Sequence, residues 1–278
     1  MSFAFRLFPF LVPLALALVA AGCGSDASSS DFDASSLPNV RGDGGGPSFS
    51  SDASSPDGRC GQDRTGILRD FRGTNEPGGH PDFEFDMLGP DKGIVATDLG
   101  PNLKPVYNAV PPQIAGTLKS THGQEAFDQW YRDVPGVNKS MLYNLPLKVE
   151  GGKQVFDSTS FFPLDGLGWG DTPNAAHNYH FTFELHTEFE YRGGEVFQFR
   201  GDDDVWVFLN KKLAIDIGGI KPAMEEAVDL DAKAQELGIE VGKVYSFDFF
   251  FAERHRNESN FRMETTLQFV NCDPILPK

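Results

Sequence analysis

The sequence has little positive charge, since 24 Lys and Arg residues stand against 40 Asp and Glu residues. The formal net charge is −16 at pH 7. A chain this acidic is repelled by nucleic acid, so we expect no nucleic-acid partner. Its charge suits divalent cations or neutral ligands such as sugars. The sequence also lacks the G-x-S-x-G pattern of serine hydrolases and a phosphate-binding glycine loop, so we assign no catalytic residue.

Long hydrophobic runs are confined to the N-terminus. Met1–Gly22 has one arginine followed by the apolar stretch Leu7–Ala21, the pattern of a secretory signal peptide. Its end, Ala20-Ala21-Gly22-Cys23, resembles the lipobox of bacterial lipoproteins, although Ala20 stands where Leu is usual. That resemblance implies cleavage before Cys23 and a lipid anchor in a membrane. In the bacterial sorting pattern an Asp after the cysteine favours retention in the inner membrane. Gly24 stands there instead, which implies export to the bacterial outer membrane or cell surface. The alternative to a lipobox is an ordinary signal peptide.

Cysteine is rare, with three residues in 278. Once Cys23 is acylated, Cys60 and Cys272 remain, and they bracket the region that we expect to fold. Export permits oxidation, so we predict a disulfide between them. Residues 24–59 are mostly Ser, Gly, Asp and Pro and cannot bury enough apolar surface to fold. We therefore expect a signal peptide over 1–22, a lipidated cysteine with a disordered linker over 23–59, and a single domain over 60–278.

The domain shows the period-2 alternation of half-buried strands. Two helices are expected, at His122–Asp133 and at Asp231–Leu237, the second capped by Asp231 and ended by Gly238. Strands follow one another through tight turns such as Asn210-Lys211, without the helical crossovers of parallel sheets. The pattern predicts an all-β fold, an antiparallel β-sandwich of jelly-roll character with one or two short helices. The clearest strands are Asn178–Tyr191, Val196–Arg200, Val205–Leu209, Val244–Ala252 and Phe261–Phe269.

One face of the strand at 178–191 carries polar side chains. His180 and His186 share this face but lie about 20 Å apart along the strand, too far for a zinc site. Glu184, Glu188 and Glu190 lie on the same face, where two carboxylates could support glycoside hydrolysis. We interpret all of these side chains as a solvent-facing surface.

Asp202, Asp203 and Asp204 are consecutive and lie where one apolar strand ends and the next begins. Adjacent carboxylates repel one another, so the turn is either solvated or neutralised by a hard cation. Calcium is bound by six to eight oxygens from carboxylates, amides and backbone carbonyls. The turn is therefore a candidate calcium site.

Four blocks in order carry a family resemblance: FFPLDGLGWG, HNYHFTFELHTEF, GDDDVWVFLNKKLAIDIGG and FFAERHRNESNF. They resemble the fibro-slime domain, a relative of the anthrax protective-antigen-type sandwich found in yeast flocculins. The matching region runs from about Ile67 to Phe269 and covers nearly all of the chain after the linker.

In that family a paired Asp-Asp, often joined by a cis peptide, binds calcium, and a nearby loop adds an Asn and backbone carbonyls. The resemblance puts the pair at Asp202 and Asp203. Because Asp204 stands where the family has Gly, the register within the three aspartates stays open. Asn260, or alternatively Asn257, is the expected distant ligand.

The metal of that family contacts sugar hydroxyls. The chain is therefore expected to be a surface-anchored, calcium-dependent carbohydrate-binding or adhesion module. The alternatives are a glycan-acting hydrolase and a structural surface sandwich whose calcium is purely structural.

Overall fold

The computed structural model describes residues 39–41, 63–110, 119–271 and 273–277. The predicted signal peptide and all three cysteines, Cys23, Cys60 and Cys272, lie outside the described residues. Lipidation and the disulfide therefore stay predictions. Within the segment expected to be a linker, Asn39–Arg41 forms a short strand, β1, that pairs in parallel with β3. No helix among the described residues is long and apolar enough to cross a membrane.

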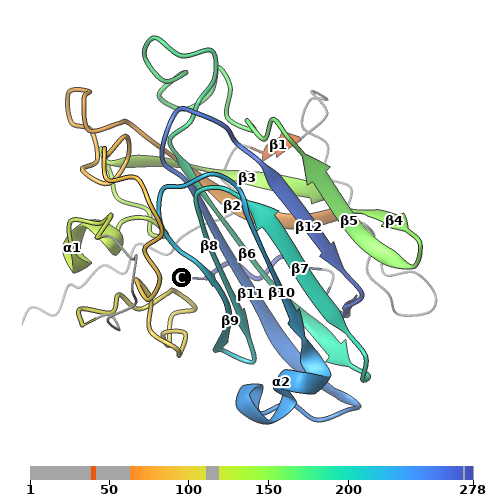
Figure 1. Cartoon of the computed structure of the whole chain (residues 1–278). Helices are drawn as coiled ribbons and strands as arrows, with labels where there is room; N and C mark the ends of the chain where they lie inside the picture. Colours follow the sequence, from red (N-terminus) through yellow and green to blue (C-terminus); the bar gives the residue numbers. More distant parts are fainter. Residues whose placement is uncertain (1–38, 42–62, 111–118, 272, 278) are drawn as a thin grey trace, which may run out of the picture. The chain divides into compact units, whose positions relative to one another are not determined.

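Two sheets make up the fold (Figure 1), and every pairing except that of β1 with β3 is antiparallel. This confirms the predicted all-β antiparallel sandwich. The larger sheet runs β1, β3 (Asn138–Pro146), β2 (Asp63–Phe71), β6 (Phe181–Tyr191), β11 (Lys243–Glu253), β8 (Asp204–Leu209) and β9 (Lys212–Ile217), with β13 (Gln268–Phe269) also on β6. The smaller sheet runs β10 (Met224–Asp229), β7 (Val196–Gly201), β12 (Phe261–Thr265), β5 (Lys153–Ser158) and β4 (Lys148–Glu150).

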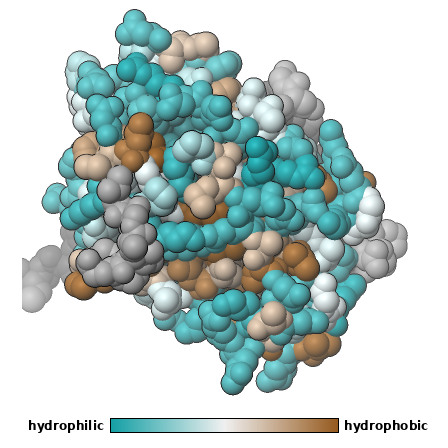
Figure 2. Space-filling view, viewed as in Figure 1, coloured by the Kyte–Doolittle hydropathy of each residue, from teal (hydrophilic) through white to brown (hydrophobic). Residues whose placement is uncertain are grey.

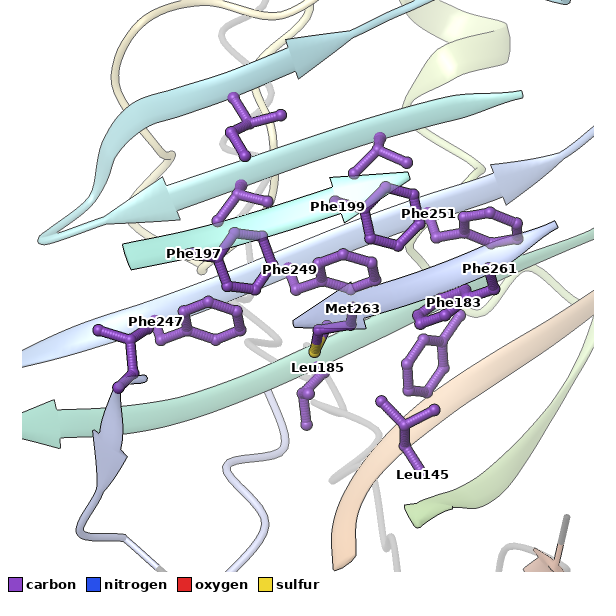
Figure 3. Packing of buried hydrophobic residues seen from close by; sticks show 14 of the residues in the cluster. Leu145, Phe183, Leu185, Phe197, Phe199, Phe247, Phe249, Phe251, Phe261 and Met263 are labelled. Atoms are coloured by element: carbon purple, nitrogen blue, oxygen red, sulfur yellow. The ribbon is translucent and has the colours of Figure 1, made fainter. Parts of the chain in front are cut away.

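The main core lies between the two sheets and is dominated by phenylalanine (Figure 3). Side chains that alternate along each strand meet across the gap. Phe197 on β7 lies 5.2 Å from Phe247 on β11, and Phe199 lies 5.4 Å from Phe249, between ring centroids. Tilted and edge-on aromatic pairs at this spacing contribute beyond the area that they bury. The side chains of β7 and β11 that the alternation placed on one face therefore point into the core.

A layer of irregular chain covers the outer face of the larger sheet; we call residues 72–110 and 119–137 the covering layer (Figure 1, orange to yellow-green). Its apolar side chains pack on the outward-facing residues of β8 and β11 and form a second core. This core contains Phe71, Phe83, Ile94, Val95, Leu99, Phe127, Trp130, Tyr131, Trp206, Phe208, Phe250 and Ala252. The domain thus has three layers rather than the two of a plain sandwich.

Helical structure is shorter than predicted in the covering layer. Only Gln124–Phe127 forms helix α1, and turns continue to residue 132. The expected helix over His122–Asp133 is therefore mostly wrong, but the aromatic residues of this segment, Phe127, Trp130 and Tyr131, are buried.

The second helix, α2 (Leu230–Leu237), lies where it was expected and ends at Gly238, whose φ of 67° is left-handed. Its N-cap is Asp229, which accepts a hydrogen bond from the Ala232 amide at 3.1 Å. Asp231 instead accepts from the Tyr191 hydroxyl and the Gly194 amide. The predicted capping residue was therefore wrong by two positions.

The polar face of β6 is not solvent-facing, contrary to the prediction. His180, Glu184 and His186 are only 2%, 0% and 3% exposed, because the covering layer lies over them. Glu184 accepts hydrogen bonds from Arg69 at 2.7 Å and from the Lys104 ammonium at 2.6 Å to each carboxylate oxygen. Although burial opposes it, these two cations hold the pKa of Glu184 below its ordinary value. A buried ionic cluster therefore joins the covering layer to the sheet.

Candidate functional site

The acidic turn, Asp202–Asp204, connects β7 to β8. All three side chains are buried, with exposed fractions of 3%, 4% and 0%, so the turn is not a solvated loop. The Asp202–Asp203 peptide bond is cis, the geometry that the resemblance associates with the paired aspartates. The turn lies beside residues 254–260, which link β11 to β12.

Asp202 is held by Asn260. The backbone N–H of Asn260 donates to Asp202 Oδ1 at 2.6 Å, and its side-chain amide donates to Asp202 Oδ2 at 3.0 Å. The Asn260 amide nitrogen also donates to Glu258 at 3.1 Å. The structure thus brings together two residues that the sequence placed in one candidate site.

Asp203 is held by backbone groups from two other segments. Its Oδ1 accepts from the Lys221 N–H at 3.0 Å, and its Oδ2 accepts from the Arg254 N–H at 3.1 Å. Burial and the neighbouring Asp204 raise the pKa of Asp203 to about 7. A carboxyl group with such a pKa gains from a cation that stabilises its ionised form.

Asp204 has a different role from its two neighbours. Its Oδ1 accepts from the Gly219 N–H and its Oδ2 from Arg254 Nε, each at 2.6 Å. Arg254 is fully buried and also donates to the Ser120 carbonyl in the covering layer. Asp204 was expected among the metal ligands, but both of its oxygens are engaged in this structural ion pair and we assign it no ligand role.

Glu253 is the residue that sequence reasoning missed. It is 0% exposed, and neither of its carboxylate oxygens makes a hydrogen bond of good geometry, although Ser259 and the His255 N–H act on the group to lower its pKa. Its chain neighbours Ala252 and Arg254 both bond to Asp203 through their backbones, which places Glu253 against the acidic turn. Burial is the main cause that raises the pKa of Glu253 well above its ordinary value, and the charges of Asp203 and Asp202 raise it further. Three buried carboxyl groups therefore share one region.

Lys221 supplies the nearby ammonium group, but it points at backbone carbonyls. Its Nζ donates to the carbonyls of Asp203 at 2.5 Å, Gly219 at 3.0 Å and Ile217 at 3.4 Å. Burial lowers the pKa of Lys221, although the negative charges of Asp204 and Asp203 act to raise it. Lys221 therefore offsets part of the negative charge and fixes the segment after β9, although its ammonium group forms no ion pair with the carboxylate of Asp202 or Asp203.

A pocket of about 630 Å³ opens beside the acidic turn, and we call it the turn pocket. Asp202 and Asp203 both line it, whereas Asp204 does not. Asn257, the alternative ligand, also lines it, and its amide lies 3.1 Å from His255 Nδ1 instead of at the aspartates. The acidic pair is thus accessible to a small ligand although its side chains are mostly enclosed.

The donor chemistry of the turn fits calcium. Among the residues that the structure describes, no three His, Cys, Asp or Glu side chains converge as a metal site. A cation here therefore needs amide or backbone oxygens in addition to carboxylates, and calcium accepts such oxygens readily whereas zinc prefers nitrogen and sulfur. The buried carboxyl group of Glu253, whose pKa is raised, would be stabilised in its ionised form by a divalent cation beside it.

The chain is similar to proteins of Dictyostelium discoideum. It is 41% identical to "Protein psiD" over 200 residues, which cover 68% of this chain and 39% of psiD. It is 42% identical to "Protein psiJ" over 212 residues, 68% of this chain and 29% of psiJ. The chain thus spans well under half the length of these relatives.

These relatives correct one prediction. An exported protein of the bacterial outer membrane or cell surface was expected from the lipobox-like segment. The curated relatives come from a eukaryote, which contradicts a bacterial outer-membrane location. The name fibro-slime is not confirmed by the matches either.

Solved structures give weaker matches. An "anti-sigma factor domain-containing protein" is 21% identical with a TM-score of 0.30, over 45% of this chain and 41% of that one. The PA14 domain of the MpAFP antifreeze protein is 9% identical with a TM-score of 0.27, over 46% of this chain and 76% of that one. The family comparison is more direct: residues 151–277, which contain the acidic turn and the 254–260 loop, match the PA14 domain.

Proposed function

We propose that the domain binds a carbohydrate through a calcium ion held at the acidic turn. The observation that carries this proposal is the pair of buried carboxylates, Asp202 and Asp203, which line the turn pocket with the buried Glu253 next to them. Asp202 and Asp203 would hold the ion, with the side-chain oxygen of Asn260 as the third candidate donor. When bound, calcium supplies open coordination positions that sugar hydroxyls can occupy.

The protein's own part in binding is to hold these donors in place. Asn260 donates to both oxygens of Asp202, while the Lys221 and Arg254 amides fix both oxygens of Asp203. The following strand β8 is buried along its whole length and β7 is buried at Phe197, Phe199 and Gly201, so the turn has little freedom to move. A rigid, preformed donor set lowers the entropy cost of binding both ion and sugar.

Thermal unfolding and glycan binding test the proposal together. The melting temperature of the wild-type chain should rise with calcium and fall with EGTA, because an ion that binds only the folded state stabilises it by about 2.7 kcal/mol at 100 times its Kd. A glycan array should show binding in calcium and none in EGTA.

Asp203→Asn should abolish both responses while the far-ultraviolet circular dichroism spectrum stays that of the sandwich. Glu150→Gln, which removes one charge from an exposed strand, is the matched control. A melting curve indifferent to calcium and EGTA would refute the metal site. A calcium response without binding to any glycan would make the ion structural.

A further inference from the structure

The turn pocket has two chemically different parts. Its polar lining includes Asp202, Asp203 and Glu258, while its apolar lining is Leu88, Pro90, Ile220, Pro222, Ala223 and Met224. The apolar part is built by two paired segments, because Leu88 bridges to Ile220 and the Gly89 N–H donates to the Ile220 carbonyl at 2.7 Å. A ligand that fills the pocket therefore meets carboxylates and an aliphatic wall together.

The aliphatic wall is open to solvent. Leu88 is 53% exposed and the adjacent Met87 is 39% exposed. The face of the molecule in Figure 2 is mostly hydrophilic, with smaller apolar areas between the polar ones. Leaving such side chains uncovered costs free energy that an apolar ligand group would recover.

Among the described residues that line the pocket none is Phe, Tyr or Trp, and His255 carries the one aromatic ring. An aromatic wall would stack against the flat face of a sugar ring. Branched aliphatic side chains and proline instead surround a small, rounded group such as a methyl.

The charges beside the wall disfavour an acidic ligand. Asp202, Asp203 and Glu258 line the pocket, whereas the Lys221 ammonium is committed to three backbone carbonyls. Arg254 is fully buried and paired with Asp204, and Arg256, between the lining residues His255 and Asn257, is paired with Glu84. A carboxylated sugar would meet repulsion from these carboxylates.

We propose that the turn pocket selects a neutral sugar that carries a methyl group, either a 6-deoxy sugar or an N-acetylated sugar. This inference rests on the proposed function. Sugar hydroxyls are directed to the ion at Asp202 and Asp203, and the methyl group packs among Leu88, Ile220 and Met224.

Matched sugar pairs in calcium test the proposal on the full chain. L-fucose is compared with L-galactose, which differs by a hydroxyl on the same carbon, and N-acetylglucosamine is compared with glucose. At least one methyl-bearing member should bind about four- to tenfold more tightly than its partner, as expected for one buried methyl group. A preference for L-fucose over L-galactose would identify the ligand as a 6-deoxy sugar, and a preference for N-acetylglucosamine over glucose would identify it as an N-acetylated sugar. Glucuronic acid should bind more weakly than glucose.

Leu88→Asn should remove the preference and leave binding of the partner sugar within about twofold. Val244→Asn, an equally exposed aliphatic residue on β11, is the matched control and should keep the preference. Calcium-dependent binding of both members with equal affinity would overturn this inference and leave the proposed function standing. Absence of any calcium-dependent sugar binding would overturn the proposed function and this inference with it.

Discussion

Asn260 donates two hydrogen bonds to the carboxylate of Asp202, one from its backbone and one from its side chain, across 58 residues of sequence. The side-chain amide nitrogen is used again on Glu258. The amide oxygen is thus the atom left to bind an ion. The two strand ends that carry the proposed site are held together by this residue.

Asn260→Ala should weaken both the fold and the calcium response. Removing the amide takes away one partner of a buried carboxylate, which costs about 1–3 kcal/mol of unfolding free energy. The rise in melting temperature with calcium should shrink or vanish. Asn257→Ala, in the same loop, is the control, because the Asn257 side chain contacts His255 and not the aspartates. If Asn257→Ala lost the calcium response and Asn260→Ala kept it, the ligand assignment would be reversed.

Gly201→Ala should disturb the site without changing any charge. A Cβ at Gly201 would lie 2.4 Å from the Asn260 carbonyl, so the backbone must shift at a cost of about 1–3 kcal/mol. That shift separates Asp202 from Asn260, and the calcium response should fall. Gly66→Ala creates a comparable clash, 2.3 Å from the Glu184 carbonyl, on a strand away from the acidic turn. It should destabilise the protein and leave the calcium-induced shift intact, as measured by paired melting curves.

The sequence identified part of this site. The resemblance put Asp202, Asp203 and Asn260 in one candidate site, and hydrogen bonds join Asn260 to Asp202, while their binding of calcium stays a prediction. Glu253 was missed, although the alternation of β11 indicates its position. It lies two residues after Phe251 and four after Phe249, so its side chain is on the same inward face of the strand. The partners of Asp204 could not be predicted, because Arg254 follows the strand in a loop whose path no periodicity describes.

Glu184→Gln should destabilise the protein by about 3–5 kcal/mol, since it leaves Lys104 and Arg69 buried beside an uncharged group. Glu188→Gln, on the same strand face but half-buried, should change stability by no more than about 0.5 kcal/mol. Urea unfolding of the two variants gives the comparison. Equal effects would show that the cluster does not secure the covering layer.

Asp70 gives the fold a pH dependence. Its side chain is fully buried and accepts a hydrogen bond from the Asn178 amide at 2.7 Å. Burial raises its pKa to about 7, whereas an unfolded aspartate titrates near 3.9. The folded state therefore holds a proton that the unfolded state has lost, and this contribution to stability is full below about pH 4 and is lost as the pH rises to about 7.

Asp70→Asn should remove this loss. Between pH 4 and pH 7 the wild type should lose stability relative to the variant by on the order of 2–4 kcal/mol. Urea unfolding at several pH values measures the difference, with Asp171→Asn as an exposed control from the loop that contacts Asp70. A difference between wild type and Asp70→Asn that stays constant with pH would show that Asp70 is ionised throughout.

The strands were predictable because alternation is a local signal. The patterns at Asn178–Tyr191 and Val244–Ala252 gave the backbone and inner faces of β6 and β11 correctly. The buried state of His180 and Glu184 was not predictable, since alternation shows which side chains share a face but not what covers it. The cover is residues 72–110 and 119–137, in which helix α1 spans only four residues and the rest of these described residues has no regular period.

Trp130 in the covering layer and Trp206 on β8 are both fully buried, with ring centroids 6.1 Å apart. The Arg254 guanidinium, which is bonded to Asp204, lies 4.7 Å from the centre of the Trp130 ring. Lifting the covering layer from the sheet would bring both indoles into water at once, and indole emission moves to longer wavelength in water. The intrinsic fluorescence of these two tryptophans should therefore report whether the covering layer is packed on the sheet. Trp206 lies two positions after Asp204, the carboxylate that binds Arg254.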